Sequence, residues 1–207
     1  MTASSIMNSE VFRRCEAFHG HVCPGLCLGF KAAQAAMEWL SARRSQDEEI
    51  VAIVETDACS ADAVQVITGC TFGKGNFIFR DYGKMVLTLL NRKNGQGVRV
   101  ALKDGAFRPD AEHMALIQKV IRDEITEEER QRFDQLHQVR SHEILESPEE
   151  ALFAITSVNI DLPATAVIEP SEPCARCGEP TMRSKMEIID HQKICRGCLT
   201  PENTLAT

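Results

Sequence analysis

The stretch FHGHVCPGLCLGFKAAQAAMEWLS, residues 18–41, holds the clearest structural signal in this chain of 207 residues. Its apolar residues recur at helical spacing, which predicts one helix with a buried stripe that ends near residue 41. Pro24 suits the first turn of that helix, where a missing backbone N–H costs nothing. The residues of the buried stripe are Leu26, Phe30, Ala33, Met37 and Leu40. The stretch therefore predicts a core helix that directly follows a short polar segment, residues 19–23.

Residues 50–102 indicate a sheet into which one helix is inserted. Residues 50–56 are mostly β-branched and few in number, as expected for a buried strand. A helix then follows, with Ser60 as its predicted N-cap and Gly69 at its end. Three further strands are predicted at residues 76–80, 84–90 and 97–102, and turn-rich segments join them.

Two more helices are predicted at residues 110–123 and about 127–145. Thr126 and Glu129 form a capping box at the start of the second. A short strand is expected between Ser157 and Ile168. This order predicts an α+β core domain over residues 1–165, with a mostly antiparallel sheet and flanking helices. Prolines then mark a linker, so residues 166–207 are predicted to form a linker and a small C-terminal module.

Two Cys-x-x-Cys pairs stand near the C-terminus, with seventeen residues between them. This spacing is typical of a structural zinc site, because two intervening residues let both sulfurs of a pair reach one tetrahedral ion. The predicted ligands are Cys174, Cys177, Cys195 and Cys198. Four thiolates leave no open coordination position, so this metal is expected to fold the module rather than to catalyse. His191 is expected to be a surface residue between the pairs.

A second group of metal-binding side chains stands at residues 19–23. If this segment is extended, His19, His21 and Cys23 share one face. Imidazole and thiolate together suit zinc, iron, nickel or copper. The alternative is that cysteines in this half of the chain are small buried residues. That alternative is favoured for Cys15 and Cys27, and it stays open for Cys23 and Cys70.

Cys59 follows a predicted strand and precedes a predicted helix. A thiol at a helix N-terminus has a lowered pKa, which would favour a thiolate that acts as a nucleophile or a metal ligand. Asp57 is a candidate acid–base group in the same segment. The Gly-rich residues 68–76 do not match a phosphate-binding loop, since the glycine spacing is wrong and a strand follows. We expect this loop to bring Lys74 near the site.

Charge and composition exclude several classes of function. Residues 121–150 hold ten acids and four arginines, so this stretch carries most of the net charge of −7. No basic stripe and only one Trp and one Tyr are present, so nucleic-acid binding is not expected. No apolar run is long enough to span a bilayer, and the N-terminus does not match a secretory signal. We therefore expect a cytoplasmic protein.

Four segments resemble signature segments of the family formed by the E subunits of formylmethanofuran dehydrogenase. They are FHGHVCPGL at residues 18–26, DACSADAVQ at 57–65, TGCTFGKGN at 68–76 and DYGK at 81–84. The resemblance covers roughly residues 10–155, and the paired cysteines resemble the treble-clef finger that some members carry. It implies an α+β core that is often dimeric, with a metal-binding cleft built from the His-x-His-x-Cys and Asp-x-Cys segments. The family name also implies association with a larger molybdenum or tungsten redox enzyme.

Two hypotheses about function stay open at this point. In the first, the core is a metal-dependent enzymatic or accessory domain, in which His21, Cys23 and Cys59 hold a second metal ion. The residues then available to orient the ligands or to transfer protons are His19, Asp57, Cys70 and Lys74. In the second, the protein is a non-catalytic interaction or assembly protein, and it docks a partner through the zinc module and the acidic helices.

Overall fold

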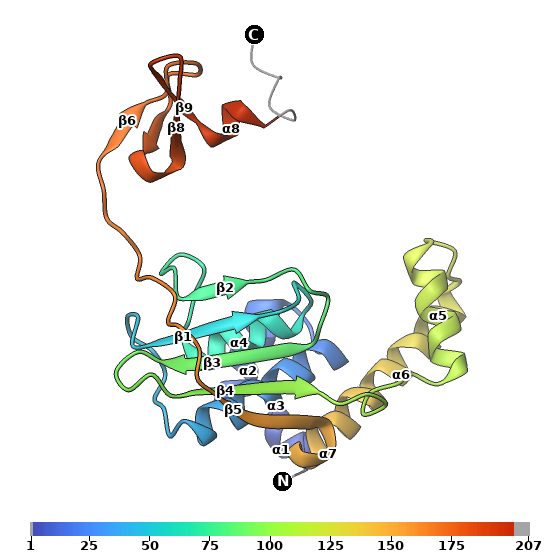
Figure 1. The fold of residues 1–207 in the computed structure, drawn as a ribbon. Helices are drawn as coiled ribbons and strands as arrows, with labels where there is room; N and C mark the ends of the chain where they lie inside the picture. Colours follow the sequence, from blue (N-terminus) through green and yellow to red (C-terminus); the bar gives the residue numbers. More distant parts are fainter. Residues whose placement is uncertain (1, 201–207) are drawn as a thin grey trace. The chain divides into compact units, whose positions relative to one another are not determined.

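The computed structural model describes residues 2–200, and it divides into two compact units between Thr165 and Ala166. The first unit combines a five-stranded sheet with seven helices among its described residues (Figure 1). The helices are α1 (Ala3–Met7), α2 (Glu10–His19), α3 (Pro24–Trp39), α4 (Ser60–Thr68), α5 (Ala111–Ile121), α6 (Glu127–Glu146) and α7 (Glu149–Leu152). The strands are β1 (Ile50–Val54), β2 (Phe77–Phe79), β3 (Val86–Asn91), β4 (Gly97–Leu102) and β5 (Phe153–Val158).

The sheet is mostly antiparallel, which confirms the predicted α+β class. Its strand order is β2-β1-β3-β4-β5. The pairs β1–β3, β3–β4 and β4–β5 are antiparallel. Only β1 and β2 pair in parallel within the described sheet, because α4 lies between them in the chain and returns it to the starting end. The loop between β1 and α4 and the loop between α4 and β2 therefore lie at opposite ends of α4, and side chains from either loop can form a site there.

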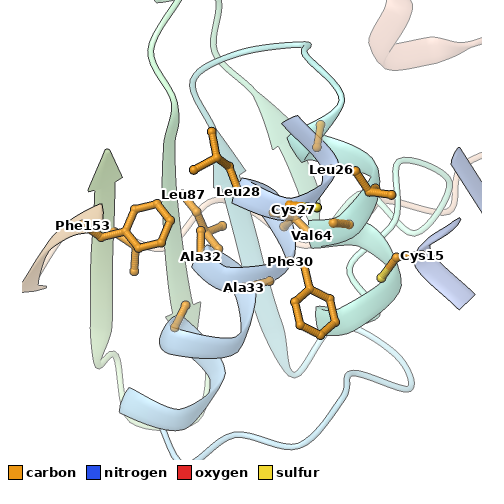
Figure 2. Close-up of a cluster of buried hydrophobic side chains, with 14 of the residues drawn as sticks. Cys15, Leu26, Cys27, Leu28, Phe30, Ala32, Ala33, Val64, Leu87 and Phe153 are labelled. Carbon is orange, nitrogen blue, oxygen red and sulfur yellow. The ribbon is translucent and has the colours of Figure 1, made fainter. Parts of the chain in front are cut away.

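Alternation along the strands separates two apolar faces. In β1, Ala52 and Val54 face the main core, whereas Val51 and Ile53 belong to a smaller cluster on the other face. The apolar stripe of α3 covers the first face, and Figure 2 shows Phe30 and its neighbours packed in that core. Cys15 and Cys27 are fully buried there, as predicted for small apolar side chains.

A close contact between α3 and α4 fixes the position of both helices. Gly29 lies in the middle of α3, where an added Cβ would lie 2.3 Å from the carbonyl oxygen of Ser60 and 2.6 Å from its Cα. No side chain fits at that distance from another backbone, so only glycine lets the helices meet this closely. The α3 helix is thereby seated on the first turn of α4.

Several predicted boundaries differ from the structure. The first residue of α4 is Ser60, and its N-cap is Cys59, one residue earlier than predicted. The last strand of the first unit is β5, which begins at Phe153 and ends at Val158, so the prediction of a strand between Ser157 and Ile168 was wrong. Phe153 is buried in the core directly after α7, and this tertiary contact sets where β5 begins. The capping box of α6 and the end of α4 at Gly69 are confirmed.

The second unit is small and built from two hairpins and a short helix. Its elements are β6 (Ser171–Pro173), β7 (Pro180–Met182), the 3-10 helix η1 (Arg183–Lys185), β8 (Met186–Ile189), β9 (Gln192–Cys195) and α8 (Arg196–Leu199). Strands β6 and β7 pair, and so do β8 and β9, both antiparallel. Its buried cluster contains only Cys174, Ile194 and Cys195 among the described residues. Across residues 2–200, none of the helices combines the length and the apolarity that crossing a bilayer requires.

The α3–α4 contact gives a direct test of the fold. Gly29→Ala should lower the free energy of unfolding by about 1–3 kcal/mol, because a methyl group there collides with the backbone of Ser60. Urea unfolding followed by far-ultraviolet circular dichroism measures this. Gly73→Ala is the matched control, since an added Cβ at Gly73 meets nothing within 4 Å. Equal stability of the two variants would contradict the packing described here.

Candidate metal centres

Three side chains predicted from the sequence come together in the core unit. One ligand atom each from His19, His21 and Cys23 lies within 4.8 Å of the other two. The His19 and His21 rings are 4.6 Å apart between centroids, and Cys23 Sγ lies 3.8 Å from His19 Nε2. Imidazole and thiolate donors at this separation form a candidate transition-metal site.

The segment brings these donors together by a turn rather than as an extended strand, contrary to expectation. His19 is the last residue of α2, and Gly20 ends that helix with φ 97°, a left-handed conformation that favours glycine. Cys23 is the N-cap of α3, where its Sγ accepts a hydrogen bond from the Leu26 backbone N–H. The two helix ends therefore hold the donors at fixed positions.

Asp62 belongs to this site, although sequence analysis did not single it out. Asp62 Oδ2 lies 2.7 Å from His19 Nδ1. A carboxylate only accepts, so Nδ1 carries the proton and donates it, which leaves Nε2 as the free donor atom for a metal. Carboxylate–histidine pairs of this kind orient metal ligands in many sites. Asp62 lies on α4 within the segment 57–65 that also holds Cys59, and this was the available signal.

Cys59 lies beside Cys23 rather than within the group of three described above. Both thiols face Gly25, where an added Cβ would lie 3.0 Å from Cys59 Cβ, 3.6 Å from Cys59 Sγ and 3.8 Å from Cys23 Sγ. Burial raises the pKa of Cys23 to about 11, and the neighbouring Cys59 adds to this rise. Cys23 is therefore a thiol without a metal, and a bound cation would have to displace its proton.

The other predicted core residues lie elsewhere. Lys74 Nζ donates to the backbone carbonyls of Ser45 and Gln46 at 3.4 Å, beyond the C-terminal end of α4, whereas Cys59 stands at the N-terminal end. The structure thus does not bring Lys74 to the cluster. Cys70 is fully buried at that same far end, and Asp57 is exposed to solvent.

The four C-terminal cysteines converge in the second unit. Cys174 and Cys198 have their sulfurs 3.9 Å apart, as do Cys177 and Cys195, and all four lie within 4.8 Å of one another. Sulfurs bound about 2.3 Å from one tetrahedral ion are roughly 3.8 Å apart, so this cluster fits a metal such as zinc. His191 is exposed in the turn between β8 and β9.

The electrostatics of the four thiols also favour a cation. Backbone N–H groups, first that of Cys195, lower the pKa of Cys174 to about 6. The neighbouring cysteines, first Cys195, raise the pKa of Cys198 to about 12. Four sulfurs this close cannot all ionise alone, whereas a divalent ion stabilises all four thiolates.

The fold and these clusters define an α+β core domain with a His/Cys group, followed by a small four-cysteine module. The family model FmdE, described as molybdenum formylmethanofuran dehydrogenase operon, matches residues 18–154. That match spans more than half of the chain, and the chain therefore belongs to the FmdE family.

Two further proteins are similar to this chain. An FmdE-like protein of Syntrophus aciditrophicus, named for tungsten formylmethanofuran dehydrogenase, has the same fold, with a TM-score of 0.60 at 21% identity. That match covers 99% of this chain and 96% of the other. A probable S-adenosyl-L-methionine-binding protein of Archaeoglobus fulgidus is 38% identical over an alignment of 186 residues that covers 86% of this chain. The match covers 50% of that relative, so this chain spans about half its length.

The geometry of the four-cysteine module predicts its response to a chelator. Removing metal should unfold residues 174–199, because the unit has almost no apolar core to replace the metal–sulfur bonds. Amide hydrogen exchange before and after chelation measures this, with the strands of the core unit as internal control. Retained protection of β8 and β9 in a metal-free preparation would contradict the prediction.

Proposed function

We propose that this protein is a metal-dependent enzymatic or accessory domain, with a transition metal held in its core by His19, His21 and Cys23. The observation that carries the proposal is the His19–Asp62 pair beside these donors, since it fixes the one His19 nitrogen that is free to bind. Such an ion supplies Lewis acidity, or a bound water of lowered pKa, to a substrate.

Cys59 has one of two roles in this proposal. It stands next to Cys23 at the N-cap of α4 and is partly exposed. It is either the fourth metal ligand or a thiol nucleophile beside the metal. Asp62 orients His19 in both cases. Asp57 and Lys74, which were expected to act at the site, have no role in this proposal.

The second unit serves, in this proposal, as a treble-clef finger with a structural zinc ion. A cysteine pair, a hairpin and a short helix that begins after Cys195 support this arrangement. Four sulfur donors with no open position suit structure rather than catalysis. Zinc fits best, because it accepts a tetrahedral thiolate set without redox chemistry.

A second candidate is a non-catalytic interaction or assembly protein. Ile168 and Ile188 of the second unit are exposed by 102% and 72%, and three glutamates crowd the first turn of α6. Exposed apolar and acidic surfaces are used for docking. The partners that fit are a second copy of the chain, as a homodimer, or a larger redox-enzyme complex in the cytoplasm.

S-adenosylmethionine binding is named for the Archaeoglobus relative alone. The match covers half of that protein, so the half that it does not cover is also available as a place for the ligand. The core cluster remains the better-supported site for this chain.

Counting metal ions separates the two candidates. The wild type should hold about two metal ions per chain, and the double variant Cys174→Ser/Cys177→Ser about one, because only the finger site is lost. In that background, His21→Ala should remove the remaining ion. Cys59→Ser should remove it only if Cys59 is a ligand. Elemental analysis measures the metal content of these four purified proteins. His191→Ala is the control, and it should keep both ions. One ion in the wild type that disappears with the finger cysteines would favour the interaction candidate.

Asp62 and Asp57 make a matched pair for testing the orientation of His19. Asp62→Asn should weaken core metal binding about 10–100-fold, because the amide does not fix the His19 ring as the carboxylate does. Asp57→Asn should leave the affinity unchanged, since Asp57 is exposed to solvent, whereas Asp62 is the residue that pairs with the ring. Competition with a chelator of known affinity measures metal binding by the two variants, each made in the Cys174→Ser/Cys177→Ser background. Equal affinities of the two variants would sink the assignment of Asp62.

A further inference from the structure

A pocket of about 500 Å³ opens beside the core cluster. His21 and Val22 form one wall, and residues 133–142, in the central and C-terminal turns of α6, form the other. His21 thus belongs both to the cluster of metal donors and to the pocket. This volume is typical of sites that enclose a small organic molecule.

His137 on α6 lines the pocket and is held by a buried partner. His113 of α5 is 2% exposed, and its Nε2 lies 2.7 Å from His137 Nδ1, so one proton is shared between the two rings. The Phe133 ring lies 4.2 Å from that of His137 between centroids. Nδ1 is therefore used by His113, and Nε2 is the His137 nitrogen available to a bound molecule.

In Figure 1, α5 and the part of α6 next to it extend beyond the edge of the sheet, whereas Ile144 and Leu145 near the C-terminal end of α6 pack in the main apolar core. Burial lowers the pKa of both His113 and His137, which favours the neutral form of both rings. His113 is buried, and burying its polar atoms is costly unless they are hydrogen-bonded, as its Nε2 is to His137. The hydrogen bond between the two rings holds His137 in one orientation, and this accounts for the buried position of His113.

The lining of the pocket selects the charge of its ligand. Its polar groups are three imidazoles, the Gln138 amide and the Asp134 carboxylate, and within residues 2–200 no lysine or arginine lines it. Phosphates and other multiply charged anions would find no cationic side chain to pair with. Met7, Val22 and Phe133 provide apolar walls. An uncharged molecule with an apolar body and one polar atom fits these surroundings.

We propose that this pocket binds a small uncharged organic molecule whose hydroxyl or carbonyl oxygen hydrogen-bonds to His137 Nε2 beside His21. His113 is a positioning residue, because it acts only by fixing the tautomer and orientation of His137. The idea that this pocket holds a substrate rests on the metal centre proposed above, because His21 belongs to both. Binding itself depends on the walls described here.

Benzyl alcohol is a suitable probe, with inorganic phosphate as the charged comparison. In full-length protein labelled with ¹⁵N in its histidine rings, benzyl alcohol should shift the His137 and His21 signals saturably, and phosphate should not. His137→Phe keeps the ring stacking on Phe133 and should weaken binding about tenfold, the value of one lost hydrogen bond. His137→Gln keeps a hydrogen-bonding amide and should lose less. His191→Ala, a histidine change in the second unit, should bind as the wild type does.

The same spectra test the role of His113. His113→Asn should change the tautomer of His137 and weaken benzyl alcohol binding, while circular dichroism confirms that the helices persist. A purely structural role of the pair would leave the tautomer unchanged, and this result would overturn the role of His113.

Other results would overturn the pocket itself. They are the absence of saturable shifts in the wild type, stronger binding of phosphate than of benzyl alcohol, or equal binding by His137→Phe. Metal analysis of the same samples separates the two proposals. Binding that depends on His137 in protein without a core metal leaves the pocket standing and removes the metal centre. Protein that holds a core metal but fails to bind benzyl alcohol leaves the metal centre standing and removes the pocket.

Discussion

The contact between α3 and the start of α4 is the constraint on which the core site depends. Gly25 and Gly29 lie on one face of α3, and the absence of side chains lets Cys59 and Ser60 approach the helix directly. Cys23 and Cys59 are the N-caps of these two helices, so seating one helix on the other brings the two thiols together. The site is a product of backbone packing, and the glycines serve the chemistry by making that packing fit.

The remaining donors are positioned by the ends of helices in the same way. His19 closes α2, Gly20 turns the chain, and Asp62 reaches His19 from α4. Two helices therefore fix the orientation of one imidazole, and little freedom is left to lose when a cation binds. This preorganisation distinguishes the cluster from a chance gathering of polar side chains on a loop.

Sequence predicted those features that depend on neighbouring residues in the chain. The stripe of α3, the capping box of α6 and the positions of β1 to β4 along the chain all arise from local patterns, and the structure confirms them. Features that depend on tertiary packing were missed. Asp62 and the His113–His137 pair each join side chains from different helices. Lys74 was expected at the site because the Gly-rich loop 68–76 was expected to bring it there, but this loop follows the C-terminal end of α4, opposite to the end where Cys59 stands.

The two clusters differ in what surrounds them, and this difference indicates what a metal would do in each. The core donors lie on a unit that already buries a large apolar core, with Phe12 and Phe30 packed edge to face at 5.0 Å. A metal there would add little to folding, so we expect its role to lie in chemistry or recognition. The second unit buries only three residues among those described, two of them cysteines. Its four sulfurs occupy the place of a hydrophobic core, because a domain this small cannot bury enough apolar surface without a metal.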